Sequence, residues 1–180
     1  MKKFSLLKVR RDVVHSRLYI FRTPVYQITP NSLEINIPIP FGLTRFGFKK
    51  EVTTEQLHIE AIKKEPFDFA CVQRAQAFAM DILSKSERVN KKHSSYGLKH
   101  IAERFFERHF GISQNTYVAN GDFILAMFLC EYKISIEKNS SPNCFFNISE
   151  TSISNAETHK YGISEDMKVK FQKEGIYDVF

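Results

Sequence analysis

The run "FILAMFLC" (Phe123 to Cys130) most constrains how this chain can fold, because its side chains are apolar in every direction around a helix. A helix without a polar face must be surrounded by the rest of the protein. The run is also shorter than the roughly 18 residues of a membrane span, and no longer apolar run occurs. We therefore expect a helix that begins at Asn120 in the centre of the core, with Asp122 in its first turn, where the helix dipole favours an acid.

Two amphipathic segments supply helices to pack around it. The first runs from Asp68, a favourable N-cap residue, to near Ser84. The second begins after a cap at Ser94 or Ser95 and ends at Gly111, a residue suited to the position after a helix. Its apolar residues recur with helical period and form one buried stripe: Leu98, Ile101, Ala102, Phe105 and Phe106.

Strand patterns flank these helices. Residues 13–21 are rich in β-branched and aromatic side chains, and residues 32–40 alternate with period two. Pro38 lacks an amide donor, which favours an edge or a strand end. Residues 132–138 and 144–149 form a predicted hairpin with its turn at Asn139, Pro142 and Asn143.

Four segments give weaker patterns. Residues 41–52 contain two Phe-Gly pairs and indicate a loop or an irregular hairpin. Residues 53–64 fit either a capped helix or an alternating strand, and we favour the strand. Residues 85–95 indicate a polar, basic linker, and "SEDMKVKFQKE" (164–174) a short surface helix.

The predicted fold class is therefore α+β, with an N-terminal strand region (1–65), a three-helix core with a hairpin (66–150) and a polar tail with a short helix (151–180). At 180 residues, these regions suit one compact domain. The order of helices and hairpin is similar to a winged helix-turn-helix, but the segment "GISQNTYVAN" is too long for the tight turn of that motif.

The charge of the chain indicates which classes of partner it can bind. The chain has a net charge of +6 and a pI near 9.2, with five basic residues and no acid in residues 1–11 and seven Lys/Arg against three Glu in residues 85–109. This imbalance favours nucleic acid or an acidic protein as partner. Early charges interrupt the apolar N-terminus, so we expect a cytoplasmic protein and no membrane partner. The three cysteines and six histidines match no usual ligand spacing, so we predict no metal and no cofactor.

The stretch "KHSSYGLKHIAERFFERHFG" (92–111) admits three interpretations. Its polar face can be an ordinary solvated surface with a Lys99–Glu103 pair. It can bind phosphates, because a helix N-terminus offers free amides and Tyr96 or His93 can stack on a base. It can also be catalytic, with His100 as a base oriented by Glu103 and Ser95 as nucleophile, although the SxxK and HExxH patterns are absent.

Three segments resemble those of a group of short proteins encoded on plasmids, integrative elements and prophages of bacteria. They cover about residues 93–150: Ser94, Ser95, Tyr96, Leu98, Lys99 and His100, then Tyr117, Val118, Asn120 and Gly121, then Ser141, Pro142, Asn143, Phe146, Asn147 and Ser149. The group has no established activity, so the resemblance implies no catalytic residues. It implies a setting in which small basic proteins act as DNA-binding accessory factors or inhibit host defence, as anti-CRISPR proteins do.

The sequence thus favours a non-enzymatic binding protein of a mobile element that engages nucleic acid or a host complex that handles nucleic acid. The predicted binding residues are Lys91, Lys92, Ser95, Tyr96, Lys99, His100, Asn120 and Asn143. The first alternative is a small hydrolase or transferase that uses His100 with Glu103 or Tyr96. The second is a structural or assembly protein of a phage-like element. The oligomeric state stays open.

Overall fold

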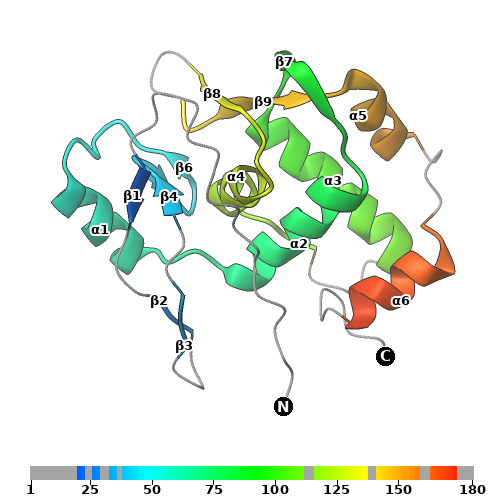
Figure 1. Cartoon of the computed structure of the whole chain (residues 1–180), viewed down its shortest axis with the longest axis horizontal. Coiled ribbons are helices and arrows are strands. Elements are labelled where there is room, and N and C mark those ends of the chain that lie inside the picture. The colour runs from blue at the N-terminus through cyan, green and yellow to red at the C-terminus, as the bar shows by residue number, and fades with distance from the viewer. Residues whose placement is uncertain are drawn as a thin grey trace.

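The computed structural model describes residues 20–22, 26–28, 33–35, 38–111, 116–137, 141–158 and 163–173. Within them, helices and antiparallel strands combine into the predicted α+β fold (Figure 1). The helices are α1 (Glu55–Lys64), α2 (Phe69–Asp81), α3 (Ser95–Phe110), α4 (Asn120–Leu129), α5 (Glu150–Glu157) and α6 (Glu165–Lys173). The strands are β1 (Ile20–Arg22), β2 (Tyr26–Ile28), β3 (Leu33–Ile35), β4 (Pro38–Pro40), β5 (Leu43–Thr44), β6 (Gly47–Phe48), β7 (Lys85–Ser94), β8 (Ile134–Ile136) and β9 (Cys144–Ile148).

Helix α4 lies at the centre of the core, as its apolar run predicts. Every residue from Asn120 to Met127 is buried, and α2 and α3 pack beside it (Figure 1). Asp68 caps α2 by accepting hydrogen bonds from the Ala70 and Cys71 amides at 3.0 and 3.3 Å. The three-helix core is therefore present with the predicted caps and the predicted buried stripe of α3.

The hairpin of β8 and β9 is also present, but it belongs to a larger sheet. Strand β9 pairs antiparallel with β8 on one side and with β7 on the other, in the order β7-β9-β8. The prediction of a linker over 85–95 is therefore wrong. Strand β7 is held through its main chain by a strand that comes much later in the sequence, and its polar side chains carry no sign of that pairing.

The N-terminal part differs from the prediction at α1. Residues 55–64 form a helix rather than the favoured strand, with Thr54 as N-cap accepting from the Leu57 amide at 3.3 Å. The alternating apolar residues do not share a buried face, since Leu57 is 43% exposed, whereas His58 and Ile62 point into the core. His58 Nε2 donates to the Leu43 carbonyl at 3.0 Å, and burial lowers the pKa of this histidine.

The irregular hairpin predicted over 41–52 is present as β5 paired with β6. Strand β1 pairs with β4, and β2 with β3. Of the strand predicted over 13–21, residues 13–19 lie outside the described residues.

The C-terminal part contains one expected helix and one that the sequence pattern did not reveal. Helix α6 matches the predicted surface helix, and its Phe171 is buried against Phe106 and Phe110. Helix α5, rich in Ser and Asn, packs on α3 through buried Ile153 and Ala156. The tail is thus partly built into the core rather than attached to it.

The three cysteines are free thiols. Cys71 and Cys144 are buried and Cys130 is partly buried. Burial raises the pKa of Cys71 and Cys130 to about 12, so these thiols stay protonated and weakly nucleophilic at neutral pH. None of the described helices combines the length and the apolar character needed to cross a membrane.

Two glycines provide a matched test of the packing around α4. A methyl group on Gly121 would overlap the Thr44 carbonyl oxygen, whereas one on Gly97 would meet nothing within 4 Å. We expect Gly121→Ala to lower the free energy of unfolding by about 2 kcal/mol or more through overpacking. Gly97→Ala should raise it by about 0.5–1 kcal/mol, because alanine is the better helix former. Urea unfolding followed by circular dichroism measures both, and similar effects of the two variants would contradict the packing described.

Candidate functional site

The junction of β7 and α3 places the first of the predicted site residues. Ser94 is the helix cap, and its Oγ accepts from the Gly97 amide at 3.5 Å. Ser95 is fully buried, and its Oγ accepts from the Cys144 amide of β9 at 3.2 Å. The prediction that Ser95 meets a partner or acts as a nucleophile is therefore wrong, because this hydroxyl ties the helix start to the sheet.

One carboxylate organises the exposed end of α3. Glu103 Oε1 accepts from Lys99 Nζ and from the Val118 amide, both at 3.0 Å. Glu103 Oε2 lies 2.6 Å from His100 Nδ1, which therefore carries the donated proton, because a carboxylate only accepts. Glu103 thus joins its own helix to the segment that leads into α4.

Lys99 was predicted to present its charge to a partner, but its side chain is buried. The residue is only 5% exposed, and its ammonium group is matched by the nearly buried Glu103 carboxylate. The sequence placed Lys99 on the polar face, but that face is covered where residues 116–118 pass over it. Lys99 therefore positions its neighbours instead of contributing a free positive charge.

Two tyrosines flank this ion pair, and we call them the tyrosine pair: Tyr96 on α3 and Tyr117 on the segment before α4. Their ring centroids lie 5.3 and 5.2 Å from the same Lys99 nitrogen. Tyr96 also packs edge-on against His100, with centroids 4.6 Å apart. Both tyrosines are about half exposed, at 52% and 50%. Two half-exposed aromatic rings thus lie at the protein surface on the same buried ammonium group.

The three motif segments do meet in space. Asn120 Nδ2, at the start of α4, donates to the Pro142 carbonyl at 3.3 Å and to Asn143 Oδ1 at 3.2 Å. Because Ser95 joins α3 to Cys144 beside them, residues 94–103, 116–122 and 141–144 form one cluster. Asn120 was predicted to be a binding residue. Because it is only 6% exposed, it instead holds the cluster together.

The next residue but one, Asp122, is a fully buried carboxyl that sequence analysis noted only as a helix-dipole partner. Its Oδ1 accepts from the Asp68 amide at 3.1 Å, and its Oδ2 lies 3.5 Å from Arg45 Nε. Burial and the polar neighbours of Asp122 shift its pKa in opposite directions. Burial raises the pKa of Asp122 to about 7, because the hydrogen bond from the Asp68 amide and the charge of Arg45 offset this effect only in part.

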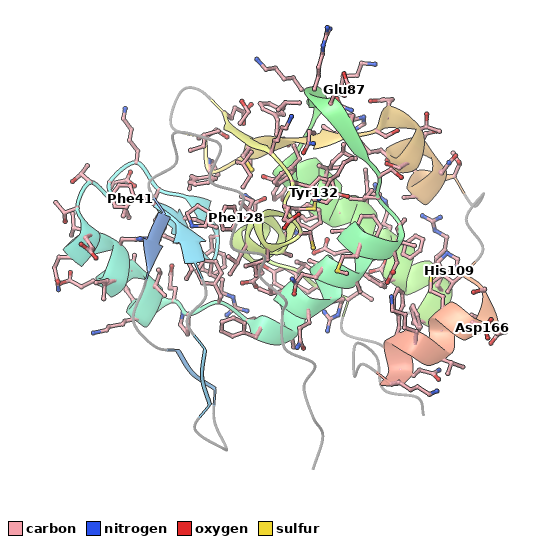
Figure 2. The ribbon with its side chains drawn as sticks, in the orientation of Figure 1. Phe41, Glu87, His109, Phe128, Tyr132 and Asp166 are labelled. Atoms are coloured by element: carbon pink, nitrogen blue, oxygen red, sulfur yellow. The ribbon has the colours of Figure 1, made fainter. Side chains whose placement is uncertain are left out.

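Strand β7 carries the exposed basic residues beside this cluster, and we call them the basic strand: Arg88, Lys91 and Lys92. Its pairing with β9 shifts register between Lys85 and Asn90 and again between Asn90 and Ser94, so the strand is bulged. In Figure 2, the side chains around Glu87 point away from the body of the protein. The bulges therefore expose the positive charges of this edge.

Strand β7 is also fastened to α5 by hydrogen bonds at the surface. Asn90 Nδ2 donates to Glu150 Oε2 at 2.7 Å, and His93 Nε2 lies 3.1 Å from Glu150 Oε1. The hydrogen bonds from Asn90 and His93 lower the pKa of Glu150. His93 is therefore engaged away from the tyrosine pair, and Tyr117 is the second aromatic residue beside Tyr96.

The predicted binding residues thus lie in one region of the fold, but several of them are buried and have structural roles. Lys91, Lys92 and Tyr96 are exposed, and His100 is partly exposed. Ser95, Lys99 and Asn120 are buried, and Asn143 is partly buried against Asn120. The sequence spacing did pair Glu103 with Lys99 and with His100, but it gave no indication that Glu103 also accepts from the Val118 amide.

The described residues contain an open cavity near β5 and β6, which bears on small-molecule binding. This cavity of about 250 Å³ lies beside the β5–β6 hairpin, lined by Phe41, Phe48, Val52 and Ile136 among others, and His100 and Glu103 are not part of its lining. Within the part of the chain that the structure describes, no group of three His, Cys, Asp or Glu residues is arranged to hold a metal ion.

Comparison with known proteins gives no relative. No protein-family model matches the chain, and neither a curated protein nor a solved structure does.

The ion pair at the centre of the cluster can be tested by breaking it. Glu103→Gln leaves the Lys99 ammonium buried without a counter-ion and should lower the free energy of unfolding by roughly 3 kcal/mol. Glu107→Gln, on an exposed residue one turn later, should cost less than about 1 kcal/mol. The double variant Lys99→Met, Glu103→Gln should recover much of the loss. Equal effects of the two glutamate changes in urea unfolding would contradict the burial of this pair.

The buried carboxyl predicts a pH dependence. Asp122 keeps its proton in the folded state up to about pH 7, while in the unfolded chain it ionises near its ordinary value of 3.8. The folded state then binds the extra proton between these values, so stability falls as pH rises through this window. From pH 5 to pH 8, we expect the wild-type protein to lose about 2 kcal/mol more than Asp122→Asn.

Urea unfolding of both proteins at the two pH values measures this difference. The lowered pKa of His58 acts with the opposite sign, because its neutral form is favoured on folding, but it is present in both proteins and cancels. The same pH dependence in Asp122→Asn as in the wild-type protein would show that Asp122 is ionised in the fold.

Proposed function

We propose that the protein binds nucleic acid through the face formed by the basic strand and the tyrosine pair. The observation that carries the proposal is the join between β7 and α3. Arg88, Lys91 and Lys92 are exposed on the bulged edge, and the chain then turns into the helix that carries Tyr96. Four residues span at most about 14 Å, so Lys92 and Tyr96 lie within about 14 Å of each other at the protein surface. Lysine and arginine are the usual partners of backbone phosphates.

The helix N-terminus itself contributes less than the sequence suggested. Ser94 already accepts from the Gly97 amide, and Ser95 faces the sheet. The phosphate contacts are therefore assigned to β7 and not to the free amides of α3. A bulged, lysine-bearing edge also prevents strands of other molecules from pairing with the sheet, and this purely structural role predicts no binding.

The enzyme alternative has one observation in its favour, the 2.6 Å contact of His100 Nδ1 with Glu103. A carboxylate that orients an imidazole is a common arrangement for a general base. However, Ser95, the nucleophile that the sequence offered, is buried and bonded to the Cys144 amide. Both Glu103 oxygens also already accept hydrogen bonds. The nucleic-acid proposal uses the exposed residues as they stand and needs no further group.

The resemblance to proteins of plasmids, integrative elements and prophages supplies the proposed setting. In that setting the protein would act in the cytoplasm of a bacterial host on the element's own nucleic acid or on a guide or target strand of a host defence system. The remaining alternative, an assembly protein of a phage-like element, drew on the N-terminal strands, and residues 1–19 lie outside the described residues.

A titration tests the proposal directly. Labelled oligonucleotides of DNA and RNA, single- and double-stranded, are titrated with the protein at about 50 and about 200 mM salt, where phosphate contacts are most clearly distinguished. Lys91→Ala, Lys92→Ala should reduce the steepness of log K against log salt by about 1.4 for a single strand, since each lost contact removes about 0.7. We expect a loss of affinity of about tenfold at the lower salt concentration.

The matched control is Lys63→Ala, Lys64→Ala, which removes the same charge from the exposed end of α1, away from β7 in Figure 1. It should lose much less affinity and keep the salt dependence of the wild-type protein. Equal losses in both double variants would reveal a general charge effect and contradict the assigned face. Absence of wild-type binding to every oligonucleotide would overturn the proposal and point to a protein partner.

A further inference from the structure

The proposed function does not specify whether the nucleic acid is single- or double-stranded. The tyrosine pair favours one of these two ligands. We infer that the protein recognises unpaired bases, by stacking them on Tyr96 and Tyr117 while the basic strand holds the phosphates. This inference rests on the proposed function and specifies its ligand as a single strand. In a duplex the faces of the bases are covered by their neighbours, so an aromatic side chain can stack only on a base that is unpaired or displaced.

The spacing of the two rings fits one strand. Both ring centroids lie within 5.3 Å of the Lys99 nitrogen, so they are at most about 10.6 Å apart. Successive nucleotides of one strand bridge distances of this order, because stacked bases are about 3.4 Å apart and an extended backbone spans more. The two rings can therefore serve neighbouring or nearly neighbouring bases.

The ring of Tyr96 and the backbone of Tyr117 are held in place before any ligand arrives. Tyr96 packs against His100, whose imidazole is fixed by Glu103. The Tyr117 carbonyl accepts from Arg74 Nη1 at 3.0 Å and from Cys71 Sγ at 3.3 Å, and the next amide, of Val118, donates to Glu103. Binding then requires little ordering of these residues, which lowers its entropic cost.

The charge inside the cluster supports stacking over phosphate binding at this point. Glu103 compensates the Lys99 ammonium group, and Lys99 is only 5% exposed. Among the described residues, a phosphate would therefore find no uncompensated cation between the two rings. The exposed cations of Arg88, Lys91 and Lys92 stand on β7, the strand that precedes α3, so phosphates and bases have separate places.

The test compares two pairs of substitutions in the full chain. Tyr96→Leu, Tyr117→Leu removes both aromatic faces and keeps apolar bulk, and Tyr96→Phe, Tyr117→Phe keeps the faces and removes only the hydroxyls. Each is titrated with a labelled single-stranded DNA, an RNA of the same sequence and the matching DNA duplex. Urea unfolding of each variant shows that it is folded.

We expect the wild-type protein to bind a single strand at least about tenfold more tightly than the duplex. The leucine variant should lose at least about 30-fold in affinity for the single strand, with little change for the duplex, because two stacked bases together contribute about 2–6 kcal/mol. The phenylalanine variant should stay within about threefold of the wild-type protein. Binding of the DNA and the RNA strand identifies which sugar the site accepts, and a preference for either single strand over the duplex supports the inference.

Quenching of tyrosine emission gives an independent readout, because the chain contains no tryptophan. A single strand should quench the wild-type protein more than the leucine variant. Equal wild-type affinities for single strand and duplex, unchanged by the leucine substitutions but weakened by Lys91→Ala, Lys92→Ala, would overturn the inference and leave the proposed function standing. Absence of binding to all three oligonucleotides would overturn both.

Discussion

The contact of α4 with the β5–β6 hairpin at Gly121 fixes the positions on which the rest of the fold depends. The Gly121 amide donates to the Arg45 carbonyl at 2.8 Å, a separation that leaves no room for a side chain. On either side of it, Asn120 bonds residues 142 and 143, and Asp122 bonds the Asp68 amide. Three consecutive residues thus anchor the central helix to three distant segments, and residues 116–119 can reach α3 only because α4 is held there.

The Lys99–Glu103 pair is better understood as a positioning device than as a source of stability. Removing two charges from water costs about as much as their attraction returns, so an apolar pair of similar size would stabilise the fold at least as well. The charged pair adds directional hydrogen bonds, which an apolar pair cannot form. A carboxylate that accepts from Lys99, His100 and the Val118 amide fixes a helix, a ring and a separate backbone segment in one geometry. Both exposed tyrosines adjoin groups that this carboxylate holds.

Burial explains which parts of the fold the sequence could predict. The stripes of α2 and α3 and the apolar run of α4 follow from local periodicity, and these helices form where expected. The failures involve partners distant in sequence. Strand β7 has no apolar alternation and is defined by β9, while α1 buries His58, a residue that a hydrophobic pattern does not count. Lys99 looks exposed on its helix until residues 116–118 cover it, so its loss from the binding surface could not be foreseen.

The charges and rings on the proposed face also indicate which effect would dominate binding. Because Glu103 pairs with Lys99, the cations that the proposed face presents are the exposed Arg88, Lys91 and Lys92 of the basic strand. Three phosphate contacts to a single strand give a salt slope of only about −2, so affinity would fall by about 20-fold between 50 and 200 mM salt. Two stacked bases contribute roughly 2–6 kcal/mol that salt hardly screens. At physiological salt the tyrosine pair would therefore carry at least as much of the binding energy as the basic strand, and the preference would be for unpaired bases of any sequence.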